Sequence, residues 1–405
     1  MSDLGNLEKL ARSAAQLPVS AYFDAARYRH EIATLFDTAP RYVGHALMVP
    51  EVGDFHTLPQ ERDGRMLVRK APDGAVPGSG IALLSNVCRH RQAIIKNGRG
   101  NTSNHIVCPL HRWTYGLDGS LVGAPHFADN PCLNLASTRL SIWNGLLFEA
   151  GRELTHLPAR DVARELGAMH VAMDINPFDF SGYLFDHVEL HECAYNWKTF
   201  IEVYLEDYHV GPFHPGLGGF VDCSKLGWEF GDWYSVQTVG VNNGLSRPGS
   251  ETYRKWHEVV MNFRGGEQPA FGAIWFTYYP NIMVEWYPHV LVISTLVPRG
   301  AEKCTNIVEY YYPEEIALFE REFIEAGQQA YDETAREDDE ICMRMTAGRR
   351  ALWLEGREEH GPYQSPMEDG MVHFHEFMRR ELKKGAGAGA EAEACAREGA
   401  AKILL

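Results

Sequence analysis

Apolar positions change their spacing along the chain, and this change predicts where helices give way to strands. Up to about residue 40 the spacing is helical, with Tyr28, Ile32 and Phe36 on one face. From there to about residue 150, short apolar runs alternate with Gly, Pro, Asn and Asp, a pattern typical of a small antiparallel β domain. These runs span residues 45–49, 66–69, 81–85, 106–107 and 146–149.

The second half of the chain predicts a larger antiparallel sheet with helices. Residues 151 to about 190 are polar and predict a connector. Helical stretches then alternate with five longer runs rich in β-branched and aromatic residues, which predict strands. Pro313 and the two acids after it predict the start of a helical region that continues to about Leu354, and a last amphipathic helix is expected near residues 373–382. The five predicted strands span residues 233–241, 273–279, 282–287, 290–298 and 304–312.

Length and composition predict the domain organisation. At 405 residues the chain exceeds one typical core. We therefore predict an α+β protein, with N-terminal helices over residues 1–40, a β domain over residues 41–155 and a larger domain over residues 156–384. Residues 385–405 form a low-complexity tail rich in Gly and Ala.

Charge and cysteine usage restrict the partners and the compartment. The chain carries 54 acidic and 38 basic residues, a net charge of −16, which argues against nucleic acid or an anionic membrane as a partner. No apolar run is long enough to span a bilayer, and the first residues lack the basic start and apolar core of a signal peptide. Six of the eight cysteines are scattered without paired spacing, as reduced thiols are. A cytoplasmic location is expected.

Two short half-sites, each with one thiol and one imidazole, predict a metal centre. Cys88 and His90 form the first, and Cys108 and His111 form the second, seventeen residues further on. A zinc finger of the Cys2His2 type places both cysteines in one half and both histidines in the other. Mixed halves instead match the Rieske centre, in which two histidines replace two cysteines on one iron of a [2Fe-2S] cluster. Zinc in the same four ligands is the alternative.

A second constellation follows in the larger domain. Glu206 and His209 are three residues apart, so on a helix they share a face, and Gly211 and Pro212 are expected to break that helix so that His214 turns back toward His209. Two imidazoles and one carboxylate make the facial triad that leaves positions open for O2 on Fe(II). The acidic run at residues 337–342 supplies the best candidates for the carboxylate. Ordinary polar residues at a helix end and a solvated helix face are the alternatives.

These motifs together resemble the catalytic α subunit of the Rieske non-heme iron ring-hydroxylating oxygenases. The resemblance covers nearly the whole chain and includes the Asn-Trp-Lys segment at residues 196–198. It implies a Rieske β domain followed by a helix-grip catalytic domain with an antiparallel sheet. It also implies one [2Fe-2S] cluster on Cys88, His90, Cys108 and His111, and one Fe(II) on His209, His214 and Asp338, with Asp339 as the fallback third ligand.

The same resemblance implies an assembly and an electron path. Glu206 takes the place of an acid, usually Asp, that links the cluster of one subunit to the iron of its neighbour, whereas Asp207 is wrongly phased by one residue. A head-to-tail ring, most often a homotrimer, follows. The chain has no dinucleotide-binding Gly motif after a strand, so electrons from NAD(P)H are expected to arrive through a ferredoxin, a reductase or both. Glu in place of Asp resembles the branch that acts on quaternary ammonium compounds, and Val203 stands where many relatives carry Asn.

We therefore expect a terminal oxygenase that uses O2 to hydroxylate an aromatic substrate or an aryl acid. The alternatives are a monooxygenase or N-demethylase for a quaternary ammonium or methylated amine, a non-catalytic Rieske electron carrier, and a zinc-stabilised helix-grip protein that binds a ligand. Aromatic residues facing the iron are expected to line the substrate pocket. The candidates are Phe213, Phe276, Tyr278 and Trp286.

Overall fold

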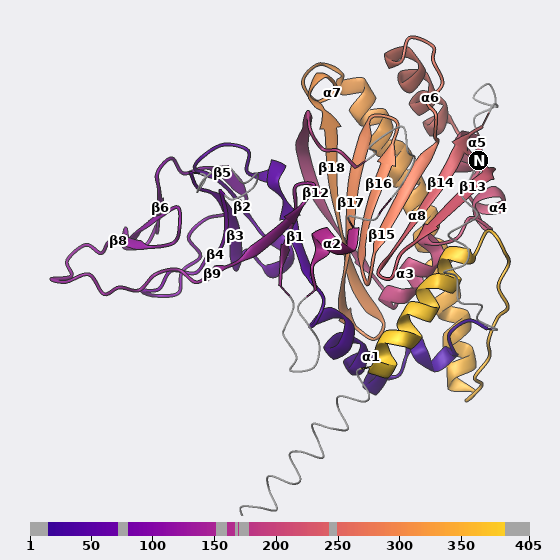
Figure 1. Cartoon of the computed structure of the whole chain (residues 1–405), viewed down its shortest axis with the longest axis horizontal. Coiled ribbons are helices and arrows are strands. Elements are labelled where there is room, and N and C mark those ends of the chain that lie inside the picture. Colours follow the sequence, from indigo (N-terminus) through magenta and orange to yellow (C-terminus); the bar gives the residue numbers. More distant parts are fainter. Residues whose placement is uncertain are drawn as a thin grey trace, which may run out of the picture. The chain divides into compact units, whose positions relative to one another are not determined.

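A computed structural model describes residues 15–71, 80–150, 160–166, 169, 178–242 and 249–384 (Figure 1). Contacts divide the chain into two units: one contains residues 39–153, and the other combines residues up to 38 with those from 165 onward. Helix α2 (Val162–Leu166) spans the boundary between the two units in sequence, which falls between residues 164 and 165. The N-terminal segment, which we expected as a separate element, thus groups with the second unit. The predicted tail at residues 385–405 lies outside the described residues.

The first unit is built from three antiparallel sheets around a core that includes Met66, Leu84, Ile106 and Tyr115. The predicted run at 45–49 forms a short 3-10 turn after the first strand, whereas the other four predicted runs are strands. The sheets are β5-β2-β3-β4-β9, β1-β11-β10 and β6-β7-β8. Their strands are β1 (Arg41–His45), β2 (Asp54–Thr57), β3 (Arg65–Arg69), β4 (Ile81–Ser85), β5 (Arg99–Asn101), β6 (His105–Val107), β7 (Thr114–Gly116), β8 (Leu121–Gly123), β9 (Ser137–Thr138), β10 (Leu140–Trp143) and β11 (Leu146–Glu149).

The second unit contains a seven-stranded antiparallel sheet in the order β12-β18-β17-β16-β15-β14-β13 (Figure 1). The five predicted strands are present, with ends shifted by up to two residues. The two strands at the edges were missed, because edge strands carry charged residues and lack a clear apolar pattern. The strands are β12 (Tyr183–Cys193), β13 (Val221–Phe230), β14 (Tyr234–Val241), β15 (Ala273–Tyr278), β16 (Ile282–Tyr287), β17 (Val290–Gly300) and β18 (Lys303–Pro313).

Helices cover one face of this sheet, and α8 crosses behind it in Figure 1. Polar side chains set where helices begin: Asn196 accepts a hydrogen bond from the Lys198 N–H, and Ser250 accepts one from the Tyr253 N–H. No helix of the described ranges combines the length and the apolar composition needed to cross a membrane. The helices are α1 (Ala25–Glu31), α3 (Trp197–Tyr204), α4 (Val210–Phe213), α5 (Pro215–Phe220), α6 (Glu251–Phe263), α7 (Glu314–Phe319), α8 (Arg321–Leu354) and a last helix at residues 369–384.

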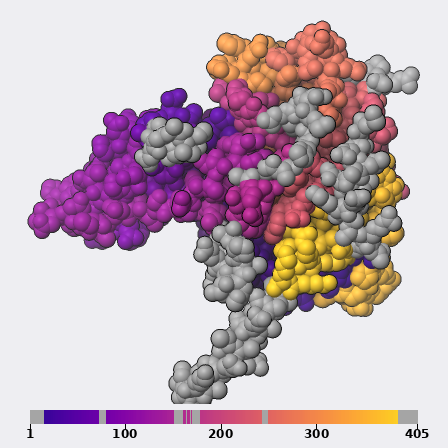
Figure 2. Space-filling model, in the orientation of Figure 1, coloured from indigo at the N-terminus to yellow at the C-terminus, as the bar shows by residue number. Residues whose placement is uncertain are grey.

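The first and last described segments of the second unit lie side by side. The Arg379 guanidinium donates a hydrogen bond of 2.6 Å to the Ala15 carbonyl, and His30 Nε2 lies 3.1 Å from the Leu382 carbonyl. In Figure 2 the yellow C-terminal helix borders indigo N-terminal residues. The N-terminal segment is therefore held by the end of the chain.

A buried carboxylate joins four segments of this unit. Glu202 of α3 is 1% exposed and accepts hydrogen bonds from Tyr22, from Arg349 of α8 at 2.7 Å and from His375 of the last helix at 2.9 Å. We call these four residues the Glu202 hub. Burial alone would raise the pKa of Glu202, but the Arg349 charge and the His375 hydrogen bond overcome it and lower the pKa to about 2. The carboxylate is therefore ionised and paired.

One turn earlier on α3, a second buried ion pair reinforces this contact. Lys198 Nζ lies 2.6 Å from Glu31 Oε2 of α1, and both side chains are fully buried. Trp197 Nε1 donates to the same carboxylate oxygen at 3.3 Å. Both charges are thus compensated, as a buried ion pair requires.

We expect the Arg349→Ala substitution to lower the free energy of unfolding by roughly 3–5 kcal/mol, because it leaves the buried Glu202 charge without its main partner. Urea denaturation followed by circular dichroism measures this. Arg344→Ala on the same helix is the matched control, because Arg344 is 73% exposed in its pair with Glu340. Exposed pairs of this spacing are worth about 0.3–0.5 kcal/mol. Equal losses in the two variants would contradict the hub.

Candidate metal centres and substrate cavity

Two loops of the first unit repeat one backbone conformation. The Gln92 N–H donates to the Cys88 carbonyl at 3.0 Å, and the Arg112 N–H donates to the Cys108 carbonyl at 3.1 Å. Gln92 and Arg112 both have left-handed φ angles, 54° and 61°, four residues after their cysteines. Two equivalent turns therefore present two equivalent cysteines.

The four predicted cluster ligands come together between these loops. Cys88 and Cys108 are each 2% exposed, and their side chains contact one another. The His90 and His111 rings lie with centroids 4.6 Å apart. The buried Nδ1 of His90 has no hydrogen-bond partner among the described residues. Paired thiols, paired imidazoles and an unpaired ring nitrogen are what a binuclear iron–sulfur centre with mixed ligands requires.

Aromatic residues support this centre. The Tyr115 hydroxyl lies 3.4 Å from Cys88 Sγ and accepts a hydrogen bond of 3.1 Å from the Arg89 N–H. The His90 ring stacks on Trp113 with centroids 5.0 Å apart and planes 6° from parallel. The stacking fixes the orientation of a ligand ring, and the hydroxyl is placed to hydrogen-bond a ligand sulfur, which tunes such centres.

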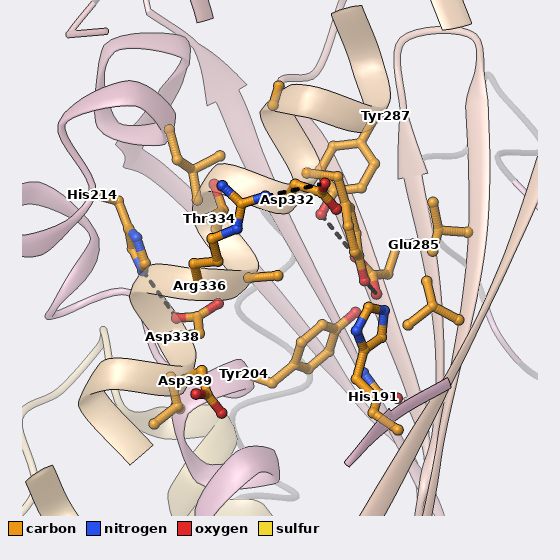
Figure 3. A pocket seen from close by; sticks show the side chains of 18 of the residues that line it. His191, Tyr204, His214, Glu285, Tyr287, Asp332, Thr334, Arg336, Asp338 and Asp339 are labelled. Carbon is orange, nitrogen blue, oxygen red and sulfur yellow. Dashed lines mark hydrogen bonds and ion pairs between the residues drawn. The ribbon is translucent and has the colours of Figure 1, made fainter. Parts of the chain in front are cut away.

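The second unit gathers two histidines and one carboxylate. His209 Nε2 and His214 Nε2 are 3.0 Å apart. Asp338 Oδ1 lies 3.0 Å from His214 Nε2 and 3.4 Å from His209 Nε2. Figure 3 shows His214 and Asp338 facing one another. Around a metal with bonds of about 2.1 Å, ligands at right angles lie about 3.0 Å apart, so these three atoms fit one ion. Asp339 lines the adjacent cavity but does not belong to this group of three.

The local chain path differs from the predicted one. Helix α3 ends at Tyr204, so Glu206 and His209 lie in the turn before α4 and not on one helix. Glu206 Oε2 accepts hydrogen bonds from the Tyr208 and His209 N–H groups and holds this turn. Pro212 does not break α4, because proline is tolerated in a first helical turn. The chain reverses instead at His214, where α4 meets α5.

Each of the two histidines at the proposed iron site has a carboxylate beside its Nδ1 atom. Glu206 Oε1 lies 2.5 Å from His209 Nδ1, and Glu337 Oε2 lies 2.7 Å from His214 Nδ1. Both Nε2 atoms are thereby directed at Asp338. Burial alone would lower the pKa of His209, but Asp338 and Glu206 raise it to about 10. The site therefore favours a cation. We had assigned no role to Glu337, although its position beside Asp338 was a signal.

A cavity of about 660 Å³ opens onto this group of three, between the sheet and its helices (Figure 3). Side chains from β12, β15, β16, β17 and β18 form one wall, and α3, α5, α6 and α8 contribute the other. Its lining includes Tyr204, Trp275, Glu285, Tyr287 and Tyr331. It is the place where a substrate could meet a bound metal.

The four aromatic residues predicted for this pocket do not line it, which is a correction. Phe276 packs on Phe178 with ring centroids 5.5 Å apart, and the Tyr278 hydroxyl donates to Glu165 at 2.6 Å. Successive residues of a strand point to opposite faces. The cavity is therefore lined by the neighbours of the predicted residues. Phe276, Tyr278 and Trp286 face away from it, and Phe213 is outside the lining as well.

Comparisons with known proteins agree with this architecture. Residues 180–384 match the family model of the ring hydroxylating alpha subunit catalytic domain, and residues 44–137 match the Rieske [2Fe-2S] domain. The fold resembles the crystal structure of the quaternary ammonium Rieske monooxygenase CntA with L-carnitine. That match has a TM-score of 0.68 and 18% identity, and covers 91% of this chain and 96% of that one. The predicted fold class is confirmed.

Two similar proteins carry the name putrescine 2-hydroxylase. The one from Ralstonia nicotianae is 62% identical over 94% of this chain and 100% of its own length, and the one from Bordetella bronchiseptica is 54% identical over 94% and 88%. The choline monooxygenase of Atriplex hortensis is 28% identical over 92% of this chain and 79% of its own length.

We expect the His209→Ala variant to lose mononuclear iron and turnover while it keeps the visible absorbance of the cluster, because the two centres use separate ligands. Iron per chain should fall from about three atoms to about two. Metal analysis and absorption spectroscopy measure both quantities. Tyr208→Phe, which changes an exposed neighbour, is the control and should retain all the iron. An unchanged iron content in His209→Ala would exclude His209 as a ligand.

Proposed function

Since the chain belongs to the family of ring-hydroxylating oxygenase alpha subunits, with a Rieske [2Fe-2S] domain ahead of a catalytic domain that binds mononuclear iron, we propose that it hydroxylates a C–H bond of a short aliphatic diamine such as putrescine. One observation carries the choice of substrate. Eight acidic residues and seven tyrosines line the cavity at the proposed iron site, against one arginine. Such a lining suits a small, flexible cation.

This proposal replaces the aromatic substrate expected from the sequence. The one arginine of the lining, Arg336, lies 3.6 Å from Asp332, so an aryl carboxylate would have to compete with that acid for the one arginine that the cavity offers. The similar proteins named above, putrescine 2-hydroxylase and choline monooxygenase, also support an amine. The family takes its name from ring hydroxylation, but this name does not identify the substrate of this chain.

We assign the metal ligands on the geometry described above. Cys88, His90, Cys108 and His111 would hold the cluster, and His209, His214 and Asp338 would hold the iron. Iron in a facial triad supplies activation of O2 at its open positions. The protein's own residues hold the ligand rings in place and exclude water from the reacting carbon. The balance is one C–H bond, one O2, two electrons and two protons converted to one C–OH group and one water.

The electrons would come from outside the chain. We propose a ferredoxin, a reductase or both as donors that carry electrons from NAD(P)H to the cluster, within a head-to-tail homotrimer. Glu206 is the candidate bridge between the cluster of one subunit and the iron of the next. Its support is the 2.5 Å contact with His209 and a side chain that is 14% exposed, so that one edge remains available.

A second candidate function is oxidation of a quaternary ammonium compound. The seven tyrosines of the lining favour it, because aromatic faces bind trimethylammonium groups through cation–π contacts. The two functions differ in one requirement: a diamine has N–H groups that need acceptors, and a trimethylammonium group has none. A carrier without catalysis and a zinc-stabilised binding protein are set aside, since the catalytic family model covers residues 180–384.

We expect the holoenzyme, supplied with a reductase and NADH, to consume O2 when putrescine is added, because the acidic cavity concentrates the dication next to the proposed iron site. An oxygen electrode and mass spectrometry with isotopically labelled O2 measure uptake and the incorporated oxygen atom. Choline, L-carnitine and benzoate are the comparison substrates. Uptake that depends on choline or benzoate but not on putrescine would contradict the proposal.

A further inference from the structure

One buried carboxylate of the cavity has no part in either metal centre. Glu285 of β16 is 3% exposed. Its Oε2 accepts a hydrogen bond of 2.7 Å from the Tyr287 hydroxyl, and its Oε1 accepts bonds of 3.1 Å from Ser294 and from Tyr331. All three donors are neutral hydroxyls. Among the residues that the structure describes, no lysine, arginine or histidine pairs with this carboxylate.

The contrast with Glu202 shows what Glu285 lacks. Both carboxylates are buried in the same unit, but Glu202 has Arg349 as a cationic partner. Burial raises the pKa of Glu285 to about 7, and the charge of Asp338 contributes to this rise. Placing a carboxylate in a protein interior without a counter-charge is unfavourable, and such groups are usually paired. A cation from outside the chain would complete the pairing.

Aromatic rings surround Glu285 on the cavity side. Trp275 and Tyr310 lie in the same row across the sheet, since Trp275 pairs with Glu285, and Tyr310 is reached through the next strand. Tyr204 and Tyr331 face the row from the helices, and the Tyr204 hydroxyl has no hydrogen-bond partner among the described residues. Aromatic faces around a carboxylate bind ammonium groups well.

Helix α8 connects the surroundings of Glu285 to the proposed iron site. Tyr331, which contacts Glu285, and Asp338 are seven residues apart on this helix. Seven residues make two turns, so the two side chains share a face and are separated by about 10.5 Å along the axis. Figure 3 shows Glu285 and Asp338 on different sides of one pocket.

We propose that Glu285 binds the distal ammonium of the diamine and thereby selects both the second positive charge and the length of the substrate. This inference rests on the proposed function. An ammonium–carboxylate contact spans about 2.8 Å, and three extended bonds from that nitrogen span about 3.8 Å. Together they span about 6.6 Å, which is about 4 Å less than the 10.5 Å between Tyr331 and Asp338 along α8. The carbon at that point is the third from the bound ammonium and the second from the other end of putrescine. Glu285 Oε2 has one donor and so retains acceptor capacity.

The anchor predicts a dependence on chain length that a structural role would not produce. Glu285→Asp keeps the charge but withdraws the carboxylate by one carbon. We expect it to raise the ratio of kcat/KM for 1,5-diaminopentane to that for putrescine. Glu285→Gln removes the charge and should lower kcat/KM for putrescine about 30- to 1,000-fold, as truncation of a buried charge pair does. Iron content and cluster absorbance should stay unchanged in both variants.

Glu309→Gln is the matched control. Glu309 is also buried, at 4% exposure, and also has a hydrogen bond from the tyrosine two residues later, Tyr311 at 2.8 Å. It does not line the cavity, and we expect its substitution to leave putrescine turnover and the length preference at the wild-type values. A Glu285→Asp variant that loses activity toward both diamines by the same factor would overturn the anchor while the proposed function stands.

Failure of the proposed function gives a different result. If the wild type consumes no O2 with any diamine, calorimetry of the holoenzyme with putrescine, without O2, decides the inference. Binding that disappears in Glu285→Gln supports the anchor although the reaction is another one. The absence of binding in the wild type overturns both the function and the anchor.

Discussion

The ion pair between Glu202 and Arg349 is the contact on which the proposed iron site depends. Glu202 lies four residues before Glu206 and joins α3 to α8. On α8, Arg349 follows Asp338 by eleven residues, which is close to three turns, so both side chains lie on one helix face. The chain that follows α3 carries His209 and His214, and α8 carries Asp338, so the buried pair joins the two parts of the chain that carry the proposed ligands. A buried ion pair adds little stability compared with apolar packing, but its geometry fixes one register of the two helices.

The proposed metal ligands of both units are oriented by neighbouring groups outside the proposed ligand sets. In the first unit, equivalent turns after Cys88 and Cys108 fix the backbone, and Trp113 fixes the ring of His90. In the second, Glu206 and Glu337 hold the far nitrogens of the two histidines. Because these neighbouring groups hold the imidazole rings, the ring nitrogens are already positioned for a metal ion in the folded protein. The folded protein therefore holds these groups in place for the proposed centres, and the carboxylate on His209 is the proposed path for electrons toward the iron site.

The sequence predicted which candidate ligands the fold brings together better than it predicted the residues that line the cavity. Cys/His spacing and the His-x4-His pattern are local, so they identify residues such as His209 and His214 without knowledge of the fold. The face of the sheet to which a given strand residue points cannot be predicted in the same way. Every residue of β15 is buried, so no alternation of apolar and polar residues indicates which side faces the helices. The choice of Phe276 over Trp275 had no physical signal to guide it. Edge strands β12 and β13 were missed because their polar residues resemble those of loops.

Two of the buried glutamates of the second unit, Glu202 and Glu285, show how one fold can acquire a particular substrate. Glu202 is balanced within the protein, so its charge serves the architecture. Glu285 has hydroxyl donors but no cationic partner within the described part of the chain, so we propose that its charge acts on a molecule that enters the cavity. In a row of the sheet that also holds Trp275 and Tyr310, an acid at this position would favour a cation over a neutral ring. Because Tyr331, which donates a hydrogen bond to Glu285, and Asp338 both lie on α8, this helix would link the proposed recognition of charge to the proposed iron site.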